Sequence, residues 1–461
     1  TTPRGGGWWG GWWWWRLSVI CFTQSYNKTN MNEVLPKSLR GFNFKLYLIL
    51  ILILLIPTFY KTLRIYYLGD IPLDAGLNIA SQIVWLDVIF EMIQESLILP
   101  LFFLLGKSIN APQILDNKIK TGIITVGIIY AILITLISLS LDNLLFFLAQ
   151  KESILQLSSK YIKLESLAIF LSVIYKFTII VLVLLHKIRL ISLLLFLQTV
   201  LVCICDFFFI SQFTVSLNFG VLGIAYGNIL VNCILIVICI YMLKRMDVIT
   251  LNGLSLDFSW LKEWFRIGSF SGVESIIRNT VFLTVILRWI NMVEGQAYFW
   301  VSNTFIWSWL LIPVIALGEL IKKEVGRNNL KVKEIVKSAT VITSIIIMMW
   351  LLSIPFWSFF FKNLMNVDNL EVVFRVTIIA IVFYVAFAYN NIIDSVFYGI
   401  GRTDLMLIQS ILINLVFYGI IYILVLVNKI EISLNAIVLI FGLGILLDSI
   451  ITFVIYKYTL T

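Results

Sequence analysis

Residues 85–100 read WLDVIFEMIQESLILP, an apolar run that carries Asp87, Glu91 and Glu95 at intervals of four. In a helix of about 3.6 residues per turn, this spacing places three carboxylates on one face. The residues on both flanks are also apolar, so the stretch is typical of a membrane span with an acidic stripe. Carboxylates inside a bilayer normally face a bundle interior or a watery cavity. We predict a functional stripe; the alternatives are a surface amphipathic helix or a span whose acids lie at a wet end.

The composition indicates a membrane protein. Of 461 residues, 61% are hydrophobic and 13% are charged, against roughly 45–50% and about 25% in soluble domains. The apolar residues gather in long runs, which predicts an all-α polytopic membrane protein, and the alternating segments of a membrane β-barrel are missing. Basic residues collect in the cytoplasmic loops of such proteins, so the net charge of +9 does not require a nucleic-acid partner.

The cysteine and histidine content offers no metal site. Five cysteines occur without zinc or disulfide spacing, and His186 is the one histidine. The sequence also lacks a phosphate-binding glycine loop and a catalytic triad. We therefore predict that the protein is not an enzyme and that it needs no cofactor and no bound metal. Na⁺ or H⁺ is expected only as the coupling ion.

Residues 1–30 differ from the rest of the chain. They contain the low-complexity run GGGWWGGWWWW at 5–15, and Met31 begins a plausible bacterial start. We interpret residues 1–30 as a non-native or disordered leader. The alternative is a tryptophan-rich anchor at the membrane surface, because Trp favours the interface.

Twelve apolar spans follow Met31, each long enough to cross about 30 Å of hydrocarbon. Their ranges are 44–60, 76–105, 121–141, 161–185, 190–211, 219–243, 261–289, 294–321, 335–361, 371–398, 404–427 and 435–457. Four prolines within or near the ends of spans are expected to kink helices, namely Pro57, Pro100, Pro313 and Pro355.

The distribution of basic residues sets the orientation. With the N-terminus inside, the connecting segments and adjoining span ends on that side hold twenty basic residues, and those on the outer side hold nine. This bias predicts a multi-pass protein of the bacterial cytoplasmic (inner) membrane with both termini cytoplasmic. The polar, basic segment 244–260 then links an N-terminal lobe, residues 31–243, to a C-terminal lobe, residues 261–461.

The two predicted lobes echo one another. Gly106-Lys107 ends the second span and Gly326-Arg327 follows the eighth, 220 residues later. Six spans per lobe predict two six-helix bundles related by a pseudo-two-fold axis along the membrane normal. Such repeats place substrate sites near mid-membrane at the interface between the halves.

Three motifs resemble the MATE family, the multidrug and toxic compound extrusion transporters of the MOP flippase superfamily. They are LNFGVLGIAYG at 217–227, IGSFSGVE at 267–274 and YGIGRT at 398–403, which resemble the starts of the family's sixth and seventh spans and the connection after its tenth. The resemblance covers about 42–458 and implies alternating access with export of amphipathic, often cationic compounds against Na⁺ or H⁺. The chain departs from the family in its first span, where Phe44–Tyr60 contains no acid.

Intramembrane ionisable groups are the default candidates for ion coupling. The predicted coupling residues are Asp87, Glu91, Glu95, Glu274 and Asp394; Asp206 and Asp448 are further intramembrane acids noted as candidates. The alternatives are an ion pair of the stripe with Lys176 or Arg278, an internal Glu274–Arg278 pair, and helix packing for Asp448.

Substrate contacts are predicted from polar and aromatic groups in spans. Trp300, Asn303 and Trp307 share a helical face, and aromatic rings bind organic cations; the alternative is an interfacial aromatic belt. The remaining predicted contacts are Lys176, Arg278, Asn390 and Asn391.

Together these patterns predict a secondary active antiporter that exports amphipathic drugs or metabolites. Its partners are a small amphipathic substrate and membrane lipids, and the protein is expected to be a monomer. The alternative function is a flippase for lipids or lipid-linked oligosaccharides. Acids outnumber bases among the candidate groups, and this favours the antiporter because phosphate headgroups are matched by Arg and Lys. A membrane-embedded enzyme is the least supported alternative.

Overall fold

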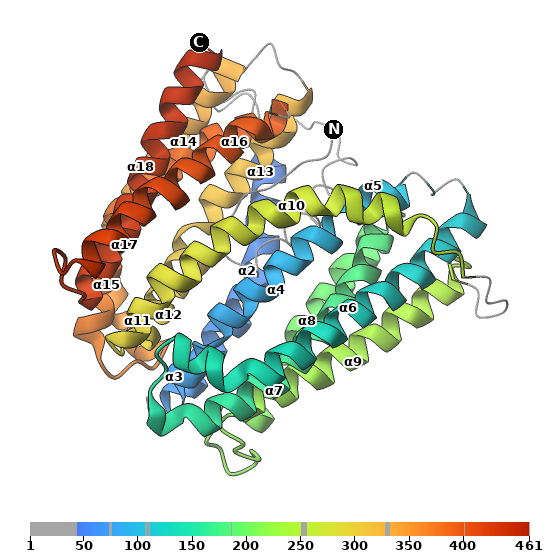
Figure 1. Cartoon of the computed structure of the whole chain (residues 1–461), viewed down its shortest axis with the longest axis horizontal. Helices are drawn as coiled ribbons and strands as arrows, with labels where there is room; N and C mark the ends of the chain where they lie inside the picture. The colour runs from blue at the N-terminus through green and yellow to red at the C-terminus, as the bar shows by residue number, and fades with distance from the viewer. Residues whose placement is uncertain are drawn as a thin grey trace. The chain divides into compact units, whose positions relative to one another are not determined.

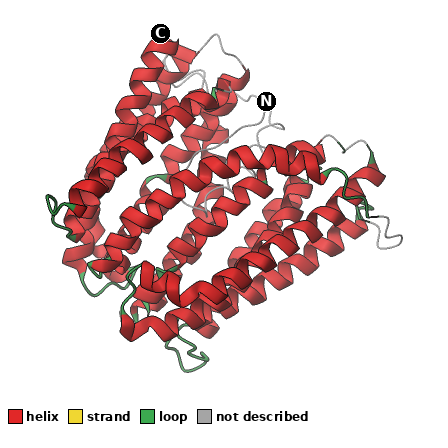
Figure 2. Ribbon diagram, viewed as in Figure 1, coloured by secondary structure: helices red, strands yellow, loops and turns green. Residues whose placement is uncertain are grey.

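The computed structural model describes residues 44–72, 76–106, 108, 111–185, 187–249, 256–327, 332–400 and 402–460. The leader predicted at residues 1–30 lies outside these ranges. Every regular element among the described residues is helical (Figure 2). The prediction of an all-α protein is therefore confirmed for this part of the chain.

Helices follow one another along the chain with short connections (Figure 1). The elements up to residue 245 are α2 (Phe44–Gly69), α3 (Leu77–Ala80), α4 (Ile83–Leu97), α5 (Leu99–Gly106), α6 (Pro112–Phe147), η2 (Glu152–Ile154), α7 (Leu155–Leu184), α8 (Ile188–Phe209) and α9 (Leu222–Arg245). The later elements are α10 (Leu261–Val281), η3 (Phe282–Leu287), α11 (Arg288–Met292), α12 (Gln296–Phe305), η4 (Ile306–Leu310), α13 (Ile312–Arg327), α14 (Val332–Asn363), α15 (Leu370–Ile400), α16 (Thr403–Ile411), η6 (Leu412–Phe417), α17 (Tyr418–Leu426) and α18 (Leu434–Leu460). Three of these short elements, η3, η4 and η6, are π-helical turns.

The longer helices carry apolar side chains on their outer as well as their inner faces. On α6, Ile124, Ile128, Ile132 and Leu136 are exposed at intervals of four, and this stripe suits contact with lipid chains. Nine helices among the described residues are long and apolar enough to cross a membrane, or ten if a bent pair counts as one span. The protein is thus polytopic. The total of twelve spans stays a prediction.

The chain forms two compact units, which divide it at residues 62/63 and 283/284. Among the described residues, one unit holds Leu63–Leu283, and the other joins the part of α2 up to Thr62 with the residues from Thr284 onward. The divisions fall inside α2 and inside η3. As a result α10 packs on α4 and α5 in the first of these units. The beginning of α2 is bonded to the second, where Tyr47 donates to the Pro313 carbonyl (3.1 Å).

Small residues let α10 approach α4 closely. A Cβ added at Gly268 would collide with the carbonyl oxygen of Ser96, and one added at Gly272 would lie 3.0 Å from the Ser96 side chain. Beside this contact the buried Trp264 donates its indole N–H to the Leu97 carbonyl at 2.7 Å. The glycines are therefore required by the helix–helix distance.

Two helices break at the places where prolines were expected to act. α4 ends at Leu97, and α5 begins two residues later at Leu99, next to Pro100. The pair Gln296–Leu310 and Ile312–Lys322 bends by 52° just before Pro313. Freed carbonyls at this bend receive side-chain donors, because Thr58 binds Ser308 O (2.9 Å) and Trp350 binds Leu310 O (3.0 Å). Pro57 and Pro355 lie inside uninterrupted helices.

Candidate functional site

A buried ion pair joins the end of α2 to α8. Arg64 donates from Nε to Asp206 Oδ2 and from an Nη to Asp206 Oδ1, both at 2.9 Å. Such bidentate geometry is the strongest form of an arginine–carboxylate contact. Asp206 is completely buried, so its negative charge depends on Arg64 for compensation. Arg64 lies on α2, which continues to Gly69, beyond the end predicted for the first span at residue 60.

This pair extends to a second carboxylate through an amide. Asn228 of α9 accepts from Arg64 (3.0 Å) and donates to Glu165 Oε1 of α7 (2.7 Å). Glu165 is buried, and its Oε2 makes no hydrogen bond. Asp87 on α4 is half-buried and close enough to Glu165 to repel it electrostatically. Asp206, Arg64, Asn228 and Glu165 therefore form one hydrogen-bonded chain across α8, α2, α9 and α7, and Asp87 lies near its Glu165 end.

The other members of the acidic stripe are only partly described. Glu91 and Glu95 lie on α4 and Glu274 lies on α10, but their side chains are outside the described residues. Lys176 of α7, predicted as a partner of the stripe or of substrate, is half-buried and donates to Gln94 Oε1 of α4 at 3.2 Å. Arg278 of α10 is buried.

A second acidic cluster lies between α15 and α18. Asn390 donates from one amide nitrogen to Asp394 Oδ2 (3.2 Å) and to Asp448 Oδ2 (3.1 Å), so the two carboxylates are neighbours. Gln409 of α16 donates to Asp448 Oδ1 at 2.6 Å. The amide oxygens of Asn390 and Gln409 are buried and accept no hydrogen bond. Carboxylate and amide oxygens are the ligands that hard cations prefer.

The predicted aromatic face contains a buried hydrogen-bond network around Trp307 and Asn303 and one half-buried residue, Trp300. The Trp307 indole N–H donates to the Tyr384 hydroxyl (2.8 Å), which donates to Asn303 Oδ1 (2.9 Å). All three are buried, and the Trp307 ring also packs on Phe387. Trp300, one turn earlier, is half-buried.

The remaining predicted substrate contact, Asn391, is hydrogen-bonded to the backbone. Asn391 donates to the Val314 carbonyl at 3.0 Å, next to the bend at Pro313. Its amide therefore supports the helix break. Its neighbour Asn390 bridges the two carboxylates instead.

Sequence reasoning missed several residues of these clusters. Glu165 lies inside the span predicted at 161–185, next to Lys160 and Lys163, and was not singled out as a candidate. Gln409 and Tyr384 carry no charge and no recognisable motif. Among the described residues, no group of three His, Cys, Asp or Glu side chains is arranged to hold a metal ion.

No family model matches the sequence, and no curated protein matches it either. Solved structures do. The inward-facing conformation of a multidrug resistance MATE family transporter of the MOP superfamily has a TM-score of 0.74 and 18% identity, covering 87% of this chain and 94% of that chain. A MOP superfamily transporter from Pyrococcus furiosus, whose binding pocket of reverse polarity suggests a different function, has a TM-score of 0.57 and 19% identity over 94% and 98%.

A third similar structure is a MATE transporter from Vibrio cholerae, with a TM-score of 0.54 and 15% identity over 97% of this chain and 95% of that chain. At these identities the comparison establishes the fold. The chain has the fold of MATE transporters of the MOP superfamily, so the resemblance noted in the sequence is confirmed at that level.

Proposed function

We propose that the protein is a MATE-type secondary antiporter, which exports a small amphipathic, cationic compound in exchange for Na⁺ or H⁺. The shared fold supports a transporter with alternating access. Two of the similar structures are MATE in complex with MaD3S and with Br-NRF, and this supports a small molecule as the substrate here.

The membrane topology belongs to the same proposal. The broken segments α3–α5 and α12–α13, and the segment α10–α11, which continues through the π-helical turn η3, each count as one span. Added to α2, α6–α9, α14, α15, α16–α17 and α18, they give twelve. We propose two six-helix lobes, residues 31–243 and 261–461, in a bacterial inner membrane with both termini cytoplasmic. The protein would act as a monomer.

The cluster between α15 and α18 carries the coupling proposal. Asp394 and Asp448 share the amide nitrogen of Asn390, and two buried amide oxygens beside them lack a donor. A cation at this place would compensate the carboxylates and coordinate those oxygens at the same time. Ion and substrate drive transport when they stabilise opposite states of the protein.

The acids of α4 and α7 are proposed as a second coupling group. Glu165 is buried and its Oε2 accepts no hydrogen bond, so a proton on this oxygen would remove a buried charge, and Asp87 lies close to it. Predicted roles for Glu91, Glu95 and Glu274 in coupling belong to this proposal. So do the substrate contacts of Lys176, Arg278, Trp300, Asn303, Trp307, Asn390 and Asn391.

Transport in proteoliposomes tests the proposal when Na⁺ and H⁺ gradients are imposed separately. The wild-type protein should transport cationic dyes when one of the two ion gradients is imposed and not when the other is. Asp394→Asn and Asp448→Asn keep the side-chain shape and should abolish gradient-driven transport, while the control Asp368→Asn, on an exposed turn, should not. If both cluster variants transport dye at the wild-type rate, the ion site does not lie between α15 and α18. Movement of anionic lipid headgroups without dye transport would support the flippase instead.

A further inference from the structure

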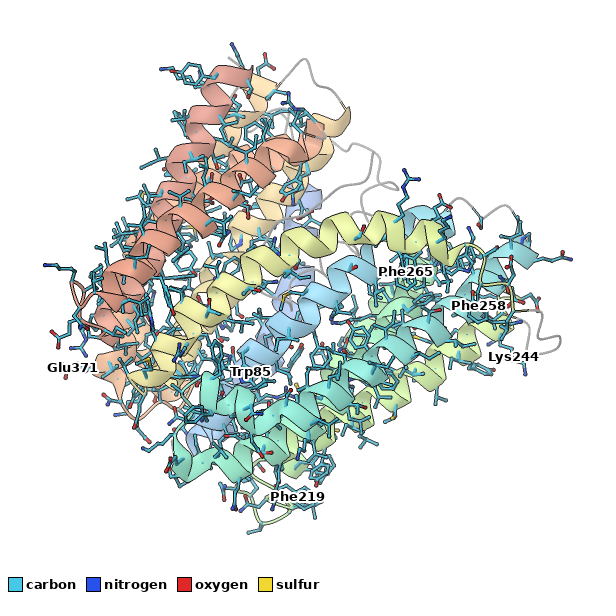
Figure 3. All side chains as sticks on the ribbon, in the orientation of Figure 1. Trp85, Phe219, Lys244, Phe258, Phe265 and Glu371 are labelled. Atoms are coloured by element: carbon cyan, nitrogen blue, oxygen red, sulfur yellow. The ribbon has the colours of Figure 1, made fainter. Side chains whose placement is uncertain are left out.

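The first turns of α10 present one continuous exposed face, the Phe258–Ser269 face. Its members on α10 are Lys262, Phe265, Arg266 and Ser269, which are exposed and stand at i, i+3, i+4 and i+7, the spacing of one side of a helix. The exposed Phe258 lies three residues before the helix begins. The two phenyl rings are 42% and 45% exposed, and Figure 3 labels both beside the start of α10. Phenyl rings interleaved with cations are typical of the boundary between lipid and water.

The opposite side of these turns is fixed to the protein. Trp260 and Trp264 stack with ring centroids 4.8 Å apart. Trp260 donates its indole N–H to Thr121 Oγ1 of α6 at 2.9 Å, and Trp264 is bonded to the Leu97 carbonyl of α4. The two tryptophans therefore hold the Phe258–Ser269 face in a defined orientation.

Contacts with α6 place this face at the polar end of a membrane span. Asn117 donates to the Asp257 carbonyl and accepts from the Asp257 N–H, both at 2.9 Å. Asn117 lies near the start of α6, a candidate span of 36 residues, and its neighbours Asp116, Lys118 and Lys120 are charged. A helix of that length extends roughly 54 Å, so its charged end reaches beyond a hydrocarbon core of about 30 Å.

We propose that the Phe258–Ser269 face binds the headgroup of an anionic phospholipid. Lys262 and Arg266 are one turn apart and both exposed, so they can meet one phosphate group together. Phe258 and Phe265 flank them and enter the region of the glycerol backbone and first acyl carbons. Glu263 is also exposed, but two cations against one carboxylate leave the face positive. The proposal does not depend on the transported substrate or on the coupling ion.

Lipid titration of the full chain in neutral detergent, read by native mass spectrometry, tests this site. Three probes are compared: dioleoyl phosphatidylglycerol, dioleoyl phosphatidylcholine and inorganic phosphate. The variant Lys262→Gln/Arg266→Gln should weaken phosphatidylglycerol binding about 25-fold, since each juxtamembrane cation contributes about fivefold, or ~1 kcal/mol. Phosphatidylcholine binding should stay as in wild type. If the double variant fails to purify, Lys262→Gln alone should show about fivefold weakening.

The matched control is Lys160→Gln/Lys163→Gln, which removes two exposed cations from α7 and should leave phosphatidylglycerol binding unchanged. Phe258→Ser/Phe265→Ser should weaken binding of both phospholipids. Equal losses in the α10 and α7 charge variants would overturn the site in favour of general attraction. Competition by inorganic phosphate at the same concentration as lipid would overturn the lipid as its ligand.

Discussion

Removing the acid of the Arg64–Asp206 pair should destabilise the unit that contains it more than any surface charge change. Asp206→Asn preserves the side-chain shape but replaces a carboxylate that has 0% side-chain exposure by a neutral amide as the partner of the guanidinium. Breaking a buried pair by removing one partner costs about 3–5 kcal/mol. At about 2–4 °C per kcal/mol for a unit of 150–250 residues, the expected fall in Tm is about 6–20 °C.

Thermal unfolding in detergent, followed by intrinsic fluorescence, measures this loss. The control is Asp116→Asn, which breaks the i,i+4 pair with Lys120 (2.8 Å), where both side chains keep some exposure; such pairs contribute about 0.3–0.5 kcal/mol. The double variant Arg64→Met/Asp206→Asn removes both charges of the pair and should lose less stability than the two single changes added together. If Asp206→Asn and Asp116→Asn lower Tm equally, the inference of a desolvated, mutually dependent pair is refuted.

Two further predictions follow from the packing and the topology. Gly268→Ala forces a Cβ into the Ser96 carbonyl and should lower the free energy of unfolding by about 1–3 kcal/mol, whereas Gly127→Ala, where the space is open, should not; equal Tm values for the two variants would contradict the close approach of α10 to α4. Cysteines replacing the exposed Asn143 and Lys244 in a cysteine-free background should label from opposite sides of the membrane, Asn143 from outside and Lys244 only after permeabilisation. Labelling of both from one side would contradict the proposed span count.

The helical membrane fold could be predicted because long apolar runs have few other solutions. The limits of individual helices could not. The first span was predicted to end at Tyr60, just before the basic residues Lys61 and Arg64, yet α2 continues to Gly69. The extension is stabilised by a carboxylate 142 residues away in sequence, and a local pattern contains no information about such a partner.

The candidate sites show the same division between local and distant information. Asp394 and Asn390 are four residues apart, so their contact within α15 follows from helix geometry. The approach of Asp448 and Gln409 depends on packing between three helices. The shared face of Asn303 and Trp307 was predicted, but the hydroxyl that joins them belongs to Tyr384 on α15. Sequence reasoning identified the polar residues and missed the groups that satisfy them.

The partners of α2 have a consequence for biosynthesis. Thr58 binds a carbonyl 250 residues later in the chain, and Tyr47 binds one 266 residues later. At roughly 5–20 residues per second, about 12–50 seconds separate the synthesis of Thr58 from that of Ser308. During that interval the inner face of α2 has none of these native partners, so lipid, the insertion machinery or a chaperone must cover it. The first of the described helices along the chain is therefore among the last to complete its packing.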